Sequence, residues 1–279
     1  MIPAFIIINA DDLGYSHHRD AAIFDLFERG KISGASLIVN GPSAEAAVKR
    51  ALKVGLPMGL HINLTEGVPL TPCNALKTRG RMPYKNTFRE LARQNSNGVR
   101  EAVKAEVKAQ LEKFEEMTGK AAQHVDGHQH VHVAPNMPAL LSDVFRSSGV
   151  KSVRIPEEWA QDYEWLSREM RVHYHTRYVD AVGSRIVYGR AGFKMNDHTV
   201  AMAMSGKSLT VGRLCRCLAG KSGVVEVLVH PGTPPTTSPP SREFCDPFDV
   251  DIGRVHEWNV FKDFNVGVAL RTWSDVASG

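Results

Sequence analysis

Two patterns of hydrophobic residues alternate along the chain. Short apolar runs rich in β-branched residues are typical of buried strands. They are separated by longer segments in which apolar residues recur every three or four positions, as on one face of a helix. The predicted strands are residues 4–10, 36–39, 58–63, 123–127, 150–155, 172–174, 224–230 and 267–271. The predicted helices are residues 17–29, 43–53, 99–118, 137–147, 196–204 and 210–219.

The order of these elements predicts the fold class. Strands and helices alternate over all 279 residues without a shift in composition, so we expect one α/β domain, residues 1–279, built from right-handed βαβ units. Seven or eight candidate strands favour a (β/α) barrel, although the count leaves an open sheet as the alternative. Two long polar segments, 67–84 and 232–247, follow strand ends and are predicted to be functional lids.

Two adjacent carboxylates follow the first predicted strand. Asp11 and Asp12 come directly after an apolar run and Asn9, and a turn at Gly14 follows them. Catalytic groups of α/β folds lie at such strand ends. Adjacent residues of a strand point in different directions, so one carboxylate can hold a metal ion while the other accepts a proton from water. An Asp before a helix is often only an N-cap, but a cap accounts for one carboxylate and not for two.

Histidines supply candidate metal ligands after two other strands. His61 follows the apolar run 58–60, where a lone histidine is more often a hydrogen-bonded core residue than a ligand. Residues 124–132, HVDGHQHVH, place four histidines and Asp126 at alternate positions. If fully extended, this row would span roughly 13 Å, whereas bonds to an ion are about 2.1 Å, so at most one or two members can be direct ligands. Together with the two aspartates, these histidines indicate a divalent metal site.

Two further polar residues end apolar segments. His230 follows the run 224–229, and an imidazole titrates near neutral pH. His230 is therefore a candidate general acid, or else it only hydrogen-bonds a loop carbonyl. Arg154, in the segment SVRIP, could orient a carboxylate, contact the substrate, or lie on the surface with its stem buried.

Composition argues against several classes of function. The net charge of +4 is small, and no block of Lys and Arg interleaved with aromatic residues resembles a nucleic-acid-binding surface. No apolar stretch is long enough to span a bilayer, and the apolar run 2–8 is too short for a signal peptide. The four cysteines are too scattered for a disulfide framework, and Cys215 and Cys217 lack the second pair of a zinc ribbon. We therefore expect a soluble, cytoplasmic protein that binds no nucleic acid.

The motifs taken together resemble those of a known family. NADDLG at 9–14, GLHINLTEG at 59–67, DGHQHVH at 126–132, SVRIP at 152–156 and HPG at 230–232 are similar, in order and spacing, to signature blocks of the YdjC-like carbohydrate deacetylases. The resemblance covers almost the whole chain. It implies a distorted (β/α) barrel, distantly related to NodB-type polysaccharide deacetylases, that is often dimeric and hydrolyses N-acetyl groups of amino sugars.

The resemblance also implies roles for the residues of the predicted centre. Asp12, His61 and His128 match an Asp-His-His set of metal ligands, and Asp11 matches the aspartate that accepts a proton. The hypothesis is hydrolysis of an acetamide with one divalent ion, in which His230 protonates the departing amine. Mixed Asp and His ligands suit Zn, whereas the family is usually associated with Mg.

Other positions of the family pattern are less directly tied to the chemistry. Arg254 and Glu257 match a C-terminal Arg-x-x-Glu feature. Gln129 stands where several members have a further histidine, and the Pro-rich stretch 233–240 is longer than usual, which bears on substrate identity. The residues expected to bind substrate are Arg154, His130, Asn63 and Glu66.

Two other functions are alternatives. A metal-dependent phosphoesterase also uses Asp and His ligands, but a two-metal enzyme needs more carboxylates near the site than the motifs offer. A regulator that binds a sugar without hydrolysing it would lack a base or a ligand, whereas all four core positions are present here. The expected partners are an N-acetylated amino sugar and a second copy of the chain, in a homodimer.

Overall fold

Parallel strands form the centre of the molecule. The structure is a computed structural model, and it describes residues 5–77, 80–234, 244 and 251–278. Seven strands in this part of the chain make one sheet in the order β5-β4-β3-β2-β1-β7-β6. They are β1 (Phe5–Leu13), β2 (Gly34–Leu37), β3 (Met58–Ile62), β4 (His124–Gly127), β5 (Ser152–Val153), β6 (His198–Val200) and β7 (Val224–Val229).

The two edges of this sheet meet. Lys194, which precedes β6, forms an isolated bridge with Ser152 of β5, and the Val153 N–H donates to the Lys194 carbonyl over 2.9 Å. Strand twist curls the sheet far enough for its edges to come together in this way. The predicted distorted (β/α) barrel is therefore confirmed.

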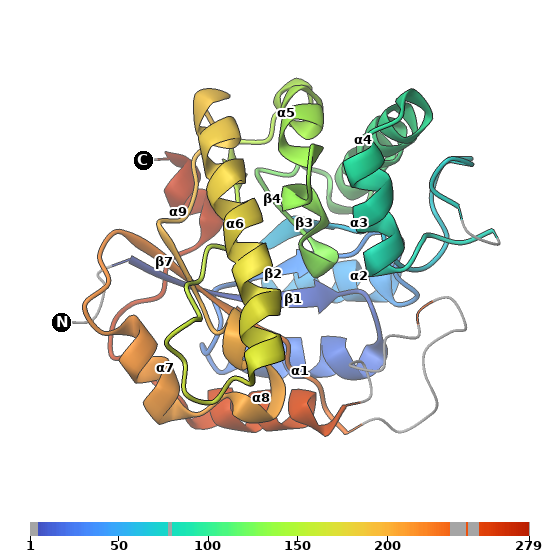
Figure 1. Ribbon diagram of the computed structural model, residues 1–279. Helices are drawn as coiled ribbons and strands as arrows, with labels where there is room; N and C mark the ends of the chain where they lie inside the picture. The colour runs from blue at the N-terminus through green and yellow to red at the C-terminus, as the bar shows by residue number, and fades with distance from the viewer. Residues whose placement is uncertain (1–4, 78–79, 235–243, 245–250, 279) are drawn as a thin grey trace.

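Helices surround the curled sheet on its outside (Figure 1). In this view α1 and α8 pack together below the sheet, α4 and α5 lie above it, and α6, which contacts α5, runs from the top of the molecule down across the front (Figure 1). The helices are α1 (His17–Glu28), α2 (Ala44–Val54), α3 (Lys85–Gln94), α4 (Asn97–Thr118), α5 (Met137–Ser147), α6 (Arg168–Arg190), α7 (Val211–Leu218), α8 (Ile252–Asp263) and α9 (Trp273–Ser278), with short 3-10 turns η1 (His128–Val133), η2 (Met202–Met204) and η3 (Gly206–Ser208). No described helix is both long and apolar enough to cross a membrane.

The longer helices form where an apolar stripe and a helix-ending residue coincide. In α4 the apolar residues Val103, Val107, Leu111 and Phe114, which recur every three or four positions, are buried against the core. Gly119 ends this helix with φ 73°, a left-handed conformation that glycine adopts without the steric penalty of a side chain. The sequence pattern therefore predicts both the face and the end of α4.

The predicted strand at 172–174 is wrong, because these residues lie within α6. The buried side of α6 consists of Arg177, Ala181, Ser184 and Tyr188. This stripe has helical spacing but few large apolar residues, so hydrophobic periodicity gave no sign of the helix.

Two further predicted elements differ from the observed ones because tertiary contacts override the local sequence pattern. Residues 196–204, predicted as a helix, contain β6 and η2, because this segment pairs with β7 and the Asn196 side chain accepts a hydrogen bond from the Ile155 N–H over 2.8 Å. Pairing and burial here override local helix propensity. Residues 267–271, predicted as a strand, form only an isolated bridge through Leu270. Helices α3, α8 and α9 were not predicted.

The two predicted lids are described only in part. Residues 67–84, of which 78–79 are outside the described chain, have no helix or named strand and lead into α3. Of residues 232–247, all but 232–234 and Phe244 lie outside the described residues. A role for either segment in covering substrate stays a prediction.

Phe244 packs against the loop that follows β3. Its ring meets the Tyr15 ring edge to face at 5.0 Å, and with Ile38 these residues form a small buried cluster. A Cβ atom added to Gly67 would lie 2.2 Å from Cε2 of Phe244, and Gly67 has φ 75°. The phenyl ring therefore occupies the space that any side chain at position 67 would need.

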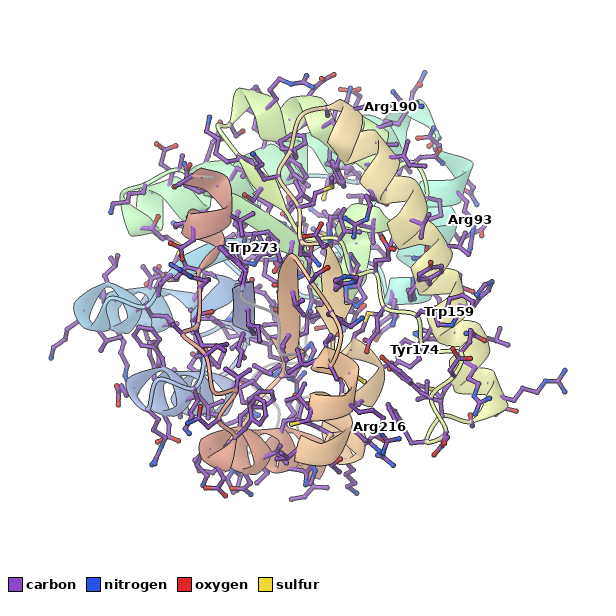
Figure 2. The ribbon with its side chains drawn as sticks, turned by 90° about the vertical axis from the view of Figure 1, so that its left-hand side faces the viewer. Arg93, Trp159, Tyr174, Arg190, Arg216 and Trp273 are labelled. Atoms are coloured by element: carbon purple, nitrogen blue, oxygen red, sulfur yellow. The ribbon has the colours of Figure 1, made fainter. Side chains whose placement is uncertain are left out.

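A cavity of about 710 Å³ lies at the amino ends of the strands. Gly34, Met58 and His124, which begin or nearly begin their strands, line it together with Trp273 of α9. The Trp273 ring stacks on the His124 ring at 4.1 Å, and Figure 2 shows Trp273 against the sheet. The carboxyl ends of the strands, where the candidate chemistry lies, are at the opposite end of the barrel.

Candidate active site

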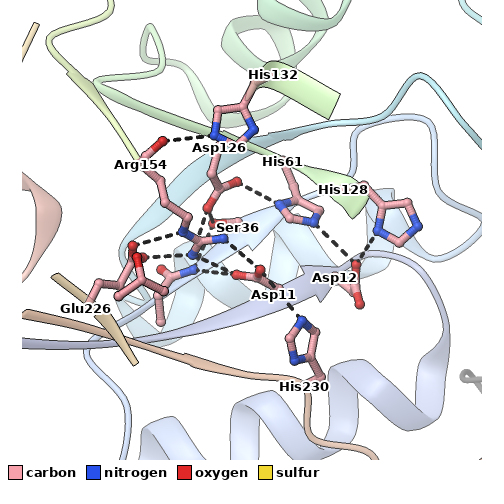
Figure 3. A network of polar contacts seen from close by, with 12 residues as sticks. Asp11, Asp12, Ser36, His61, Asp126, His128, His132, Arg154, Glu226 and His230 are labelled. Carbon is pink, nitrogen blue, oxygen red and sulfur yellow. Dashed lines mark hydrogen bonds and ion pairs between the residues drawn. The ribbon is translucent and has the colours of Figure 1, made fainter. Parts of the chain in front are cut away.

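Asp11 and Asp12 end β1 with their side chains turned apart (Figure 3). The register between β1 and β2 shifts between Ala10 and Leu13, and Asp12 has φ 71°. A bulge of this kind re-aims side chains, and a non-glycine residue in the left-handed region is strained. Both carboxylates are buried, yet they face different sets of partners.

Asp12 faces two histidines. Its Oδ1 lies 2.8 Å from Nδ1 of His128 and 3.4 Å from Nε2 of His61. The strand ends of β1 and β3 and the η1 turn after β4 bring the three buried residues together, with one ligand atom from each within 4.8 Å of the others. A carboxylate and two imidazoles are a common donor set for a divalent ion. These three residues therefore fit one.

Asp126 fixes the ring of His61. Its Oδ1 lies 2.6 Å from Nδ1 of His61, so the carboxylate accepts the N–H there and leaves Nε2 facing Asp12. The Ser36 hydroxyl donates to the other oxygen of Asp126 over 2.6 Å. A carboxylate behind a ligating histidine is the usual arrangement at metal centres, because it sets the tautomer and the ring orientation.

The electrostatic surroundings of both histidines favour positive charge. Burial lowers the pKa of His61, but the charges of Asp126 and Asp11 outweigh it and raise the pKa to about 10. Burial is likewise outweighed at His128, where Asp12 raises the pKa to about 9. Metal binding and protonation compete for the same nitrogen atoms. A site that attracts protons this strongly is also suited to a divalent cation.

Among the residues that the structure describes, two other groups of side chains are close enough to hold an ion, but their carboxylates are already engaged. The groups are Asp11 with His61 and Asp126, and His124 with Asp126 and Glu226. Asp126 uses one oxygen for His61 and the other for Ser36 and Arg154. A cation there would lie beside the fixed guanidinium, which is unfavourable in a buried site. The Asp12 group is the better candidate.

Arg154 lies behind Asp11 and contacts three acids (Figure 3). Its Nη1 and Nη2 donate to the two oxygens of Asp11 over 2.7 and 2.8 Å. Its Nε and Nη2 donate to Glu226 over 2.9 and 2.8 Å, and Nη2 also lies 2.8 Å from Asp126. Arg154 is 0% exposed. The geometry therefore supports the expected orientation of a carboxylate and does not support direct contact with substrate.

Two arginines hold the other oxygen of Asp12. Nη1 of Arg19 lies 2.8 Å and Nη2 of Arg254 lies 3.3 Å from Oδ2. Burial would raise the pKa of Asp12, but the charges of Arg19 and His128 hold it well below its usual value. Because both arginines approach Oδ2, Oδ1 is left facing the histidines.

His230 lies at the end of β7 next to Asp11. Its Nε2 is 3.8 Å from Oδ2 of Asp11, and the side chain is 17% exposed. Burial lowers the pKa of His230 to about 4, so the ring is neutral at neutral pH. Glu257 of α8 accepts hydrogen bonds from the N–H groups of His230, over 2.7 Å, and Gly206, over 2.5 Å. Glu257 therefore fixes the backbone of His230 through this hydrogen bond.

The remaining predicted substrate contacts have different surroundings. Asn63 is 0% exposed; its Nδ2 donates to the Glu66 carbonyl over 2.9 Å and its Oδ1 accepts from the Thr65 N–H over 3.2 Å. Asn63 thus shapes the loop after β3, and the geometry does not support its contact with substrate. Glu66 Oε2 lies 3.2 Å from Nε2 of His128, next to the centre. His130 is partly buried, and its contact with substrate stays a prediction.

Sequence reasoning did not assign roles to three members of this network. Glu226 carried a signal, because it is a lone charge inside the apolar strand β7. Asp126 stood out only as one member of the alternating row. Arg19 lies among polar residues in the first turn of α1, where nothing in the local sequence separates it from a surface arginine.

Comparison with known proteins bears on this site and on the whole chain. The YdjC-like protein family matches residues 5–272. The chain belongs to the YdjC-like family. Among its relatives, proteins named carbohydrate deacetylase from Mus musculus and Homo sapiens are 33% and 32% identical to this chain, over 96% and 91% of it and 90% and 83% of their own length. The resemblance expected from the motifs is confirmed.

A solved structure matches the YdjC-like chain at the level of the fold. An Enterococcus faecalis protein, described as a candidate cellobiose-phosphate cleavage protein, aligns with a TM-score of 0.74 over 98% of both chains at 19% identity. At this identity the likeness bears on the fold alone, and it agrees with the curled sheet described above.

Proposed function

We propose that this YdjC-like chain is a metal-dependent deacetylase of N-acetylated amino sugars. The relatives named as carbohydrate deacetylases support the reaction and the substrate class. The observation that carries the proposal is the separation of two adjacent buried carboxylates. Asp12 faces two histidines, whereas Asp11 faces Arg154 and His230. One carboxylate is thereby suited to a metal ion and the other to proton transfer.

The metal ion would be held by Asp12, His61 and His128. The donor set of one carboxylate and two imidazoles, with Asp126 behind His61, supports a divalent ion, Mg²⁺ or Zn²⁺. When bound, such an ion would act as a Lewis acid toward the acetyl carbonyl and would lower the pKa of water.

Asp11 is the proposed acceptor of the proton from the attacking water. Arg154 donates to both of its oxygens, and the Asn9 amide donates to Oδ1 over 3.0 Å, so the carboxylate cannot rotate away. A fixed base at hydrogen-bonding distance from the water it serves is what general base catalysis requires. Arg154 is a positioning residue in this scheme.

His230 would pass a proton to the departing amine, which is a poor leaving group until it is protonated. Because burial lowers the pKa of His230 to about 4, the imidazole is neutral before the reaction. It must gain a proton before it can act as an acid. Oδ2 of Asp11 lies 3.8 Å from Nε2 of His230. The proton taken by Asp11 can therefore reach the amine by way of this imidazole.

Product analysis tests the proposed reaction. The purified protein is incubated with an N-acetylglucosamine oligosaccharide and with p-nitrophenyl phosphate, and released acetate and phosphate are measured. Acetate release without phosphate release supports the proposal. Phosphate release alone favours the phosphoesterase, and binding of the sugar without either product favours the sugar-binding regulator.

Metal analysis of variants tests the centre itself. Asp12→Ala, His61→Ala and His128→Ala should each lose bound metal and acetate release while remaining folded. The control His175→Ala removes an exposed histidine of α6 and should keep both. A full equivalent of metal in His128→Ala would contradict the assignment, and His130 would become the candidate ligand.

The predicted homodimer and the predicted cytoplasmic location stay predictions. Sedimentation of the purified protein checks the homodimer. Fractionation of cells that express the chain checks the cytoplasmic location.

A further inference from the structure

The cavity at the amino ends of the strands is a second concave site, at the opposite end of the barrel from the proposed metal centre. Its volume of about 710 Å³ lies within the range of about 300–1,000 Å³ that is usual for pockets that hold a small organic molecule. Its walls are largely apolar, with Ile7, Leu56 and Phe114 among them. Leu52 and Lys120 also line it and are exposed, so the cavity is open to solvent near α2 and the end of α4.

Two buried polar side chains, Asn9 and His124, line this apolar cavity and are 1% and 3% exposed. The Nδ2 group of Asn9 uses both of its hydrogen atoms, because it donates to Asp11 over 3.0 Å and to the Ser36 hydroxyl over 2.8 Å. The other polar atom of the amide, Oδ1, lies beside Gly34, where an added Cβ atom would be 3.4 Å from it. Asn9 therefore offers the cavity a hydrogen-bond acceptor.

His124 offers the cavity a second acceptor. Its Nε2 has no hydrogen-bond partner among the described residues and lies 3.7 Å from Oδ2 of Asp126. The nearby carboxylate favours the tautomer that carries the proton on Nε2, so Nδ1 keeps a lone pair. Nδ1 faces Gly59, which also lines the cavity, and a Cβ atom added there would lie 2.3 Å from it. The ring stacks at 4.1 Å on Trp273, which lies against the sheet in Figure 2, so its orientation is fixed.

The two acceptors define the kind of molecule that the cavity suits. Glycine at positions 34 and 59 leaves both acceptor atoms free of a covering side chain. An acceptor in an apolar site is unfavourable without a donor, so a ligand that presents an N–H or O–H group at its buried end is favoured. The apolar walls favour a hydrophobic body for the rest of that ligand.

The Asn9 amide also connects the cavity with both parts of the proposed active site. It donates directly to Asp11, the proposed base. It donates as well to Ser36, whose hydroxyl donates to Asp126 over 2.6 Å, and Asp126 in turn holds His61. A donor bound at Oδ1 of Asn9 would fix the amide in the orientation in which Nδ2 faces Asp11.

We propose that this cavity binds a small effector, an apolar ring system with an N–H or O–H donor at its buried end, and that the bound molecule acts on Asp11 through Asn9. The ring would pack against the apolar walls while its donor meets Asn9 and His124. Binding does not depend on the proposed deacetylase function, whereas the effect on Asp11 rests on it.

Calorimetric titration with indole tests the site, because indole is an apolar ring system with one N–H donor. One molecule should bind per chain, and 1-methylindole, which lacks the donor, should bind about tenfold more weakly. His124→Phe keeps an aromatic ring against Trp273 but removes one acceptor, so it should reduce this preference. Equal binding of the two compounds to the wild type would overturn the proposal, and so would the absence of indole binding.

A second pair of variants locates the bound indole. Ala121 lines the cavity and is only partly buried, so Ala121→Trp should fill part of the space and weaken binding by about tenfold or more. The matched control Ala105→Trp, at an exposed position of α4, should leave binding unchanged. This pair keeps the test available if His124→Phe does not fold. Binding that is lost in His61→Ala but kept in Ala121→Trp would place indole at the metal centre and overturn the proposal.

Acetate release tests the connection through Asn9. Saturating indole should raise kcat/KM for an N-acetylglucosamine oligosaccharide by about two- to tenfold in the wild type, as expected for one net hydrogen bond. It should have no effect in Asn9→Ser, which lacks the amide between the cavity and Asp11. Unchanged acetate release in a wild type that binds indole would overturn the effect on Asp11. Indole binding that depends on His124 in a protein that releases no acetate would uphold the ligand site and reject the deacetylase.

Discussion

Asp11 and Asp12 show how two identical neighbours acquire different chemistry. The shift in register and the left-handed backbone of Asp12 turn its carboxylate toward His61 and His128. A non-glycine residue in this conformation costs about 1–3 kcal/mol, which the surrounding ion pairs must offset. From sequence, the pair of carboxylates predicts a division of roles. The resemblance assigns those roles, but the strained backbone that separates the two side chains leaves no mark in the residues themselves.

Asp11→Asn should abolish most turnover and leave the metal in place. The amide cannot accept a proton, and its NH₂ group must face the Arg154 donors that now bind a carboxylate oxygen. A loss of about 100- to 10,000-fold in kcat is expected for a missing general base. Initial rates and metal content are measured on the same preparations. Asn9→Ser removes one hydrogen bond to Asp11 and one to the Ser36 hydroxyl, and should stay within about tenfold of the wild type.

A wild-type rate in Asp11→Asn with intact metal would remove Asp11 from the mechanism. Loss of metal in the same variant would instead show that Asp11 helps to hold the centre together.

His230→Ala should slow an amide substrate far more than the matched ester. An amine leaves only with a proton, whereas an alkoxide needs less help, so the missing acid affects the amide by about 100- to 10,000-fold. The measurement is kcat for an acetamide and an acetate ester of the same sugar. Equal losses on both would mean that His230 only positions the substrate. Because Nε2 of the buried His132 already lies 2.9 Å from the Arg154 carbonyl, His130 would then be the next candidate.

At the scale of elements, local patterns predicted the strands and helices whose buried faces are apolar. β1, β3, β7 and α4 agree with the prediction because most of their buried residues are apolar, although each also buries polar residues. α6 was missed because its inward stripe is formed by Arg177, Ala181, Ser184 and Tyr188, a set of buried residues that hydropathy does not mark. The positions of His61 and His128 in the candidate centre followed from motif order. The polar residues behind these histidines, such as Asp126 and Arg154, could not be placed from the sequence, because sequence order does not reveal which strands become neighbours.

Helix α8 carries an element-scale prediction. The two oxygens of Glu257 accept from the N–H groups of His230 and Gly206. Glu257→Gln keeps one of these oxygens and places an NH₂ group against the second N–H, which then has no acceptor. An unsatisfied buried donor costs about 1–3 kcal/mol, so the free energy of unfolding in urea should fall by that amount. Acetate release should fall with it, because the backbone of His230 shifts, while metal content is unchanged.

Asn259→Ala, at an exposed position of the same helix, is the matched control and should alter neither property. Full activity in a destabilised Glu257→Gln would show that α8 supports the fold without positioning His230.

At the scale of the whole molecule, the interior of the barrel contains a buried polar network that joins several strands. Arg154 follows β5 and reaches acids on β1, β4 and β7, so a single guanidinium joins strands from opposite parts of the curled sheet. Removing one partner from such a buried set typically costs about 3–5 kcal/mol, because the other charges remain buried. The residues that hold the candidate base in place are therefore also those that hold the barrel together.

A contact between distant segments carries a prediction at the same scale. Gly67→Ala should be strongly destabilising, since a Cβ atom would collide with Phe244 and the φ of 75° disfavours any side chain. In a Phe244→Ala background the collision is gone and only the backbone strain remains. A double-mutant cycle in urea should therefore give a coupling free energy of about 1 kcal/mol or more. Additive effects would show that Phe244 moves aside without loss.

The same contact should be visible in evolution as well as in the test tube. Gly67 follows β3 and Phe244 follows β7, on either side of β1 in the sheet. The Phe244 ring fits only because residue 67 has no side chain. A substitution at one position changes which residues natural selection can accept at the other. Related chains with a side chain at the position of Gly67 should therefore carry a small residue in place of Phe244. The two positions should covary although they lie far apart in the sequence.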